Sequence, residues 1–115
     1  MAELKELIGK TLISIEQNKD GDEVLFTTNT GEKYKMLHYQ DCCECVMIED
    51  VVGDYEDLLN TPILVAEERS QEDENACESA TWTFYEFRTI KGSVTIRWYG
   101  ESNGYYSEEV DFCKL

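Results

Sequence analysis

Positive charge is scarce in this sequence. Its 115 residues include 10 lysines and arginines against 25 aspartates and glutamates, which gives a formal net charge of −15. Proteins that bind nucleic acid directly present a cationic face to it, so this balance argues against direct nucleic-acid binding. It favours the opposite relation, in which an acidic protein docks on a basic surface of another protein.

Long apolar runs are also missing. No stretch approaches the roughly 18 apolar residues that a membrane-spanning helix requires. The start of the chain, MAELKELIGK, mixes acids into what would be the basic beginning of a signal peptide. We therefore expect no membrane association. With 42% hydrophobic residues the composition is that of a globular chain, and its length predicts one compact acidic domain over residues 1–115.

Motifs of the common enzyme classes are absent from the sequence. It contains no G-x-x-x-x-G-K-[ST] phosphate loop, no G-x-G-x-x-G fingerprint and no G-x-S-x-G elbow. His38 is the only histidine, so any chemistry that depends on an imidazole must use it. A Cys–His dyad would have to form between sequence neighbours, which is rare. We therefore expect a protein that is not an enzyme and has no catalytic residues.

Alternating apolar residues and frequent turn signals predict a β-rich fold. Two short segments, residues 1–10 and 53–62, are expected to be helical, with Gly9 ending the first and Asp54 capping the second. The predicted class is α+β, a mainly antiparallel β-sheet of about 7–8 strands with two short helices. The predicted strands cover residues 11–17, 23–29, 33–39, 45–52, 63–69, 81–90, 93–100 and 107–115.

Aromatic residues divide into two groups. Tyrosines flank the Asn103-Gly104 turn beside several acids, a composition that suits a protein interface, although cross-strand tyrosines are also normal in sheets. The larger aromatic residues of the predicted strands are assigned to the core. These are Trp82, Phe84, Trp98 and Phe112.

Carboxylates gather in three parts of the sequence. Residues 70–79, which lack large apolar side chains, are expected to form an exposed loop within the second of them. The three groups together would steer the protein to a basic partner, with an effect that weakens in salt. They are Glu49, Asp50, Asp54, Glu56 and Asp57; then Glu67, Glu68, Glu72, Asp73, Glu74 and Glu78; then Glu101, Glu108, Glu109 and Asp111.

The cysteines suggest a metal site. There are five, and three lie in the run CCEC at residues 42–45, which does not fit a secreted disulfide framework. A tight turn could gather His38 with two of these thiols around a structural zinc ion. The alternative is that these are buried cysteines that pack as small hydrophobes beside an ordinary turn histidine. For a fourth ligand the sequence leaves open Asp41, Glu49, Asp50, Cys77 and Cys113.

Three stretches carry a family resemblance: HYQDCCECVMIEDVVGDYEDLLNTPI (38–63), TWTFYEFRTIKGSVTIRWYG (81–100) and SNGYYSEEVDF (102–112). They resemble a small family of phage and prophage proteins of unknown function, and the chain looks like a phage anti-CRISPR protein that inhibits the type II RNA-guided DNA nuclease. The resemblance implies a zinc-containing α/β fold that binds the nuclease directly. The cysteines at 45, 77 and 113 lie outside its pattern, and the implied metal ligands are His38, Asp41, Cys42 and Cys43.

The leading hypothesis is therefore a stoichiometric inhibitor of a type II CRISPR effector nuclease in the host bacterial cytoplasm. Such nucleases hold guide and target in positively charged channels that an acidic protein could occupy, blocking target-DNA loading or cleavage. We expect a monomer or weak dimer. The alternatives are a zinc-stabilised phage adaptor that binds another basic host protein, and a small thiol or metal enzyme.

Overall fold

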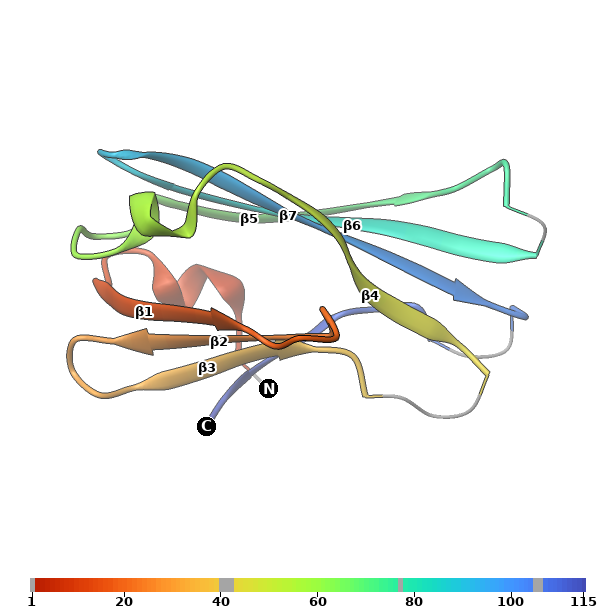
Figure 1. The fold of residues 1–115 in the computed structure, drawn as a ribbon, viewed down its shortest axis with the longest axis horizontal. Coiled ribbons are helices and arrows are strands. Elements are labelled where there is room, and N and C mark those ends of the chain that lie inside the picture. Colours follow the sequence, from red (N-terminus) through yellow and green to blue (C-terminus); the bar gives the residue numbers. More distant parts are fainter. Residues whose placement is uncertain (1, 40–42, 77, 105–106) are drawn as a thin grey trace.

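The computed structural model describes residues 2–39, 43–76, 78–104 and 107–115, and its strands form two packed layers (Figure 1). The first sheet has the order β1-β2-β3-β8 and the second the order β4-β7-β6-β5. Neighbouring strands within each sheet are antiparallel. The strands are β1 (Leu12–Gln17), β2 (Glu23–Thr28), β3 (Lys33–Leu37), β4 (Cys45–Val52), β5 (Val65–Glu72), β6 (Ser79–Thr89), β7 (Gly92–Ser102) and β8 (Asp111–Lys114).

The two segments expected to be helical are only 3-10 turns, so the α+β prediction is wrong and the fold is all-β over the described residues. The turns are η1 (Leu4–Leu7) and η2 (Tyr55–Leu58). Such short segments do not offset the cost of nucleating an α-helix, and i→i+3 hydrogen bonds close them instead. Gly9 does adopt a positive φ of 87°, and Asp54 does cap η2 by accepting a hydrogen bond from the Glu56 amide.

No helix in the described parts of the chain is long and apolar enough to cross a membrane.

Buried residues from both sheets form the core between the layers. Phe26 of β2 lies 5.6 Å from Phe87 of β6, centroid to centroid, and 6.1 Å from Phe112 of β8. Trp98 of β7 is fully buried, and its indole Nε1 donates a hydrogen bond to Met36 Sδ of β3 at 3.2 Å. The assignment of Trp98 and Phe112 to the core is therefore confirmed, and these contacts join the two sheets.

Trp82 and Phe84 are not core residues, which corrects the prediction. They lie half-buried on the outer face of the second sheet, because the register pairs Trp82 with Tyr99 while the neighbouring pair, Thr83 and Trp98, faces inward. The Trp82 ring stacks on Phe84, and the Arg97 guanidinium lies 5.1 Å above the Trp82 centroid. Strand alternation alone does not tell which face of a sheet a second layer covers.

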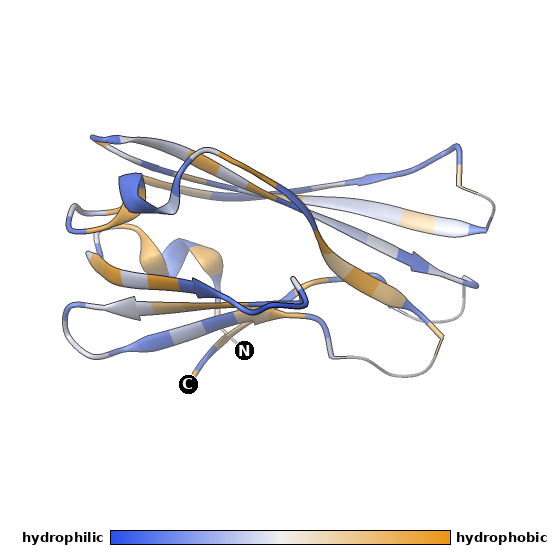
Figure 2. Ribbon diagram, in the orientation of Figure 1, coloured by the Kyte–Doolittle hydropathy of each residue, from blue (hydrophilic) through white to orange (hydrophobic). Residues whose placement is uncertain are grey.

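β5 extends further than the sequence predicts. The prediction of a loop over residues 70–79 is wrong at both ends, because β5 continues to Glu72 and β6 begins at Ser79. From Glu67 to Glu72 the side chains on both faces of β5 are exposed. Figure 2 shows hydrophilic residues along this distal half of β5 and in the loop that follows.

The inward face of β7 changes from apolar to small and polar along the strand. Val94, Ile96 and Trp98 are fully buried, and the next inward positions are Gly100 and Ser102. A Cβ on Gly100 would lie 2.8 Å from the carbonyl oxygen of Glu108. Glycine here lets the chain that precedes β8 pass close beneath the second sheet.

Replacing Gly100 with alanine should therefore force this segment away from β7. We expect Gly100→Ala to lower the free energy of unfolding by about 1–3 kcal/mol, the usual cost of overpacking, measured from urea denaturation curves. Ser93→Ala, at an exposed position of the same strand, serves as the control and should change it by less than about 0.5 kcal/mol. Equal effects of the two variants would contradict the close approach.

Candidate functional site

His38, the predicted metal ligand, lies just after β3 with its side chain only 4% exposed. Its Nδ1 is 2.6 Å from the carbonyl oxygen of Glu109. Because a carbonyl oxygen only accepts hydrogen bonds, Nδ1 must carry a proton and donate. The other ring nitrogen, Nε2, lies 3.3 Å from Oε2 of Glu44, whose side chain is 1% exposed. The imidazole is thus fixed in the interior, between a backbone carbonyl and a buried carboxylate.

This arrangement of His38 fits a metal ligand. Metal-binding histidines commonly donate their second ring nitrogen to a backbone carbonyl or carboxylate, which fixes the tautomer. The Nε2 atom is buried and forms no hydrogen bond within the described part of the chain. Without a metal, one proton between Nε2 and the Glu44 carboxyl would make the pair a buried ion pair or a neutral hydrogen-bonded pair.

The other three ligands implied by the resemblance are only partly placed. Cys43 is described and exposed, whereas Asp41 and Cys42 lie outside the described residues, as does Cys77. Within residues 2–39, 43–76, 78–104 and 107–115, no group of three or more histidine, cysteine, aspartate or glutamate side chains is arranged to hold a metal ion. A site centred on His38 would therefore depend on the segment before Cys43.

The remaining candidate ligands lie elsewhere. Cys45 is exposed at the start of β4, where the alternation of side chains places it on the face opposite its buried neighbours Glu44 and Val46. Asp50 forms an ion pair with Arg97 at 3.2 Å on the outer face. Cys113 Sγ, on β8, contacts Tyr39 Oη at 3.7 Å. Glu49 is exposed in β4. Among the described residues, no hydrogen bond or ion pair joins any of these four to His38, whose bonded neighbours are Glu109 and Glu44.

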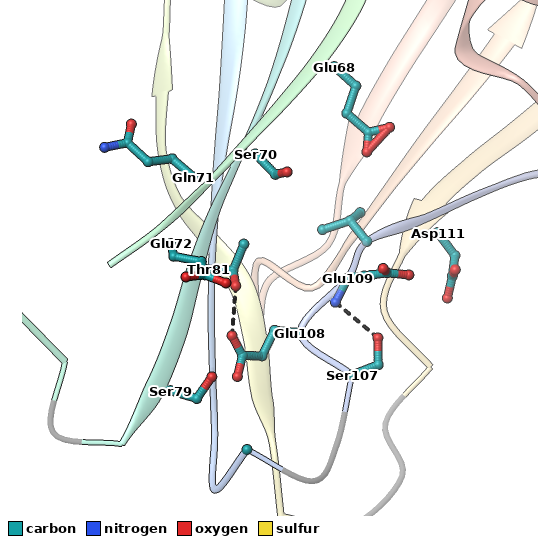
Figure 3. A pocket seen from close by; sticks show the side chains of 12 residues that line it. Glu68, Ser70, Gln71, Glu72, Ser79, Thr81, Ser107, Glu108, Glu109 and Asp111 are labelled. Carbon is teal, nitrogen blue, oxygen red and sulfur yellow. Dashed lines mark hydrogen bonds between the residues drawn. The ribbon is translucent and has the colours of Figure 1, made fainter. Parts of the chain in front are cut away.

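The second and third acidic groups of the sequence meet at one end of the sandwich. Side chains from β5 and from the chain before β8 line a cavity of about 640 Å³ there, beside the ends of β6 and β7 (Figure 3). Sequence reasoning did not predict this meeting, because it depends on β5 and residues 107–111 approaching the same side of β6. The acidic residues of the lining are Glu68, Glu72, Glu108, Glu109 and Asp111.

Hydrogen bonds hold the side chain of Glu108 in place within this cavity. It accepts hydrogen bonds from the Thr81 hydroxyl, at 2.7 Å, and from the Ser102 hydroxyl. Burial alone would raise the pKa of the Glu108 carboxyl, but the hydrogen bonds from Ser102, Ser79 and Thr81 together lower it below its ordinary value. Glu108 is therefore anionic at neutral pH and ties the segment before β8 to β6 and β7.

A hydrogen bond from Tyr99 to Asp73 holds the loop after β5 against β7. The Tyr99 hydroxyl donates to Asp73 at 2.7 Å, and this bond, with burial and nearby carboxylates, raises the pKa of Tyr99 to about 12. The tyrosine is therefore a neutral donor at physiological pH. Asp73 also lines a smaller hollow with Glu78 and Glu101, so the acidic surface continues around the end of the second sheet.

Asp54, Glu56 and Asp57 of the first acidic group lie at the opposite end, in and beside η2, whereas Glu49 and Asp50 lie midway along β4. Asp57, in η2, contacts Gly92 at the closed turn of the β6–β7 hairpin, whereas Ser79 and Ser102 pair at its open end. The open end is the acidic one: Glu72, Asp73, Glu74, Glu78, Glu101 and Glu108 lie at it or in the loops beside it, and residues 70–79 and 99–111 contain no lysine or arginine. Figure 1 shows the two ends on opposite sides of the molecule. The negative charge is therefore distributed unevenly over the protein.

Comparison with known families identifies the family of this chain. The model of DUF7448, a domain of unknown function, matches residues 5–112, which include His38 and the whole acidic end. No curated protein and no solved structure matches the chain.

The buried pair of His38 and Glu44 should make a coupled contribution to stability. In chelator-treated protein, we expect His38→Ala to lower the free energy of unfolding by about 3–5 kcal/mol, because it removes one member of a buried pair and also the donor that bonds the carbonyl oxygen of Glu109. Glu44→Gln, which removes that charge, should recover part of the loss in the double variant. Chemical denaturation of the four proteins measures this coupling. Strictly additive losses would show that the two side chains do not interact.

Proposed function

We propose that this chain, which belongs to the DUF7448 family, is a phage-encoded anti-CRISPR inhibitor. It binds a type II RNA-guided DNA nuclease directly through its acidic end and blocks target-DNA loading or cleavage. It acts in the host bacterial cytoplasm as a monomer or weak dimer, binds no nucleic acid itself, and works stoichiometrically, without catalysis.

The uneven placement of charge is the observation that supports this proposal. Carboxylates from two separate parts of the sequence line the cavity and the hollow at the open end of the β6–β7 hairpin. RNA-guided nucleases hold their guide and target in positively charged channels and recognise the heteroduplex through its backbone. A protein with one strongly anionic end is complementary in charge to such a channel. Occupation of the channel would exclude the DNA by competition.

We further propose a structural zinc ion held by His38, Asp41, Cys42 and Cys43. The buried Nε2 of His38 and the carbonyl that holds its Nδ1 support this assignment. A zinc ion bound there would contribute folding free energy and would link the β3–β4 connection to the segment before β8. His38 and the three residues after it in this set would hold the ion and would take no part in chemistry.

Inhibition should depend on charge at the acidic end. A variant with Glu74→Lys and Glu78→Lys should bind its nuclease about tenfold more weakly, mainly through slower association. Binding by the unmodified protein should also weaken as salt is added. Titrations of DNA cleavage over a panel of type II nucleases should reach their end point near one inhibitor per nuclease.

The matched control carries the same change of charge at two exposed positions outside this end. Glu56→Lys lies in η2, beside the closed turn, and Glu49→Lys lies midway along β4, at the edge of the sheet opposite β5. It should inhibit nearly as well as the unmodified protein. If no nuclease of the panel is bound or inhibited at low salt, the proposal fails. If a basic host protein is bound instead, the adaptor hypothesis replaces it, and inhibition far below one equivalent would indicate an enzyme.

Protein purified without chelator should contain about one zinc ion per chain by elemental analysis, as expected for a single structural site. His38→Ala and Cys43→Ser should lose the metal. Cys45→Ser should keep it, because Cys45 lies on the exposed outer face of β4. Metal-free protein, or equal loss in all three variants, would rule out the proposed ligand set.

A further inference from the structure

β5 presents an open edge. It ends the strand order of the second sheet, and β6 is the strand that pairs with it. The turn η1 contacts β5, and Ala66, near the start of the strand, is buried; from Glu67 onward the residues are exposed. The distal half of β5 thus presents one side of its backbone to solvent, and such an edge can pair with a further strand.

The free backbone groups of this edge belong to the even-numbered residues. The amide of Asp73 donates to the carbonyl of Ala80, directly opposite in the register, at 2.9 Å. Hydrogen-bonded pairs alternate along an antiparallel ladder, so Asp73 and the odd-numbered residues before it bond to β6. The amides and carbonyls of Glu68, Ser70 and Glu72 therefore point away from β6, toward the open edge.

The same three residues direct their side chains to the inner side of the sheet, toward the acidic cavity. Figure 3 shows Glu68, Ser70 and Glu72 on the same side of β5 as Glu109 and Asp111. On the other face, Phe84 and Gln71 line a shallow hollow together with Arg69. A strand added to this edge would place alternate side chains over the carboxylates and the remaining ones over this hollow.

We propose that the β5 edge binds an extended basic segment of a partner protein by strand addition, with lysine or arginine at every second position facing the cavity. Backbone hydrogen bonds to Glu68, Ser70 and Glu72 would fix the register, and the cavity would select the charge. The inference rests on the proposed function in one respect, that the partner is basic, and it specifies how that partner is held.

Charge argues against a second copy of this chain as the occupant. Pairing two β5 strands across a two-fold axis would bring Glu67, Glu68 and Glu72 of each copy together, with Arg69 as the single base of either strand. Each copy also carries a net charge of −15. Like charges across a strand pair are destabilising, whereas a basic segment neutralises the same carboxylates.

A peptide of eight residues, the length of β5, tests the proposal in the absence of any nuclease. Its sequence alternates lysine with threonine, and the control peptide has the same residues arranged as a lysine block followed by a threonine block. Binding of both to the full chain is followed by NMR. We expect the alternating peptide to bind about tenfold more tightly, because it alone matches the pleat. The amides of Glu68, Ser70 and Glu72 should become protected from exchange.

Ser70→Pro separates backbone pairing from charge. Proline removes the outward amide without touching the β6 ladder, as edge strands tolerate, and it should abolish the preference for the alternating peptide. Ser70→Ala keeps the amide and should retain that preference. Glu68→Gln with Glu72→Gln should weaken binding of both peptides.

Equal affinity for the two peptides, protection elsewhere on the protein, or an unchanged preference in Ser70→Pro would overturn the proposal. The amide protection measured on the unmodified protein decides the matter if Ser70→Pro fails to fold. Self-association through β5, seen as a dimer whose formation Ser70→Pro abolishes, would overturn it in favour of a second copy. A protein that inhibits no nuclease but prefers the alternating peptide would refute the proposed function and leave this inference standing.

Discussion

The long β6–β7 hairpin constrains the rest of the structure. Both strands have eleven residues, and their inward positions are apolar near the closed turn and polar near the open end. Phe87 and Val94 pair within the core, whereas Ser79 and Ser102 pair at the far end. The first sheet can cover only the apolar part favourably, because burial of polar groups without partners is costly. The second sheet therefore projects beyond the first, and its projecting end is hydrophilic and acidic.

The segment before β8 packs beneath the second sheet where that sheet projects beyond the first. Glycine at position 100 lets it pass near β7, and Glu108 binds the hydroxyls of Thr81 and Ser102. The next residue, Glu109, accepts the hydrogen bond from His38 through its carbonyl. One stretch of chain thus positions both the buried imidazole and the acidic cavity. We therefore expect a substitution at the imidazole to alter the structure of the cavity, and a substitution in the cavity to alter the position of the imidazole.

Sequence patterns located the strands well and the layers poorly. Asp54 and Gly9 were identified by local backbone chemistry, which depends only on neighbouring residues, and both behave as expected. Trp82 and Trp98 both lie in segments where apolar and polar residues alternate and aromatic residues are frequent. No local signal therefore indicates which of the two a second sheet will cover. The contact between His38 and Glu44 and the convergence of β5 with residues 107–111 arise from tertiary packing. The metal ligands His38, Asp41, Cys42 and Cys43 stay a prediction.

The two tryptophans have a practical consequence. Trp98 is sealed between the sheets against the Met36 sulfur, and Trp82 lies half-exposed on the opposite face beneath the Arg97 guanidinium. Indole fluorescence depends on the polarity around the ring, so the two emit from different environments. The protein carries one intrinsic reporter of its interior and another of its outer surface, and conservative replacement of either would allow the other to be observed by itself.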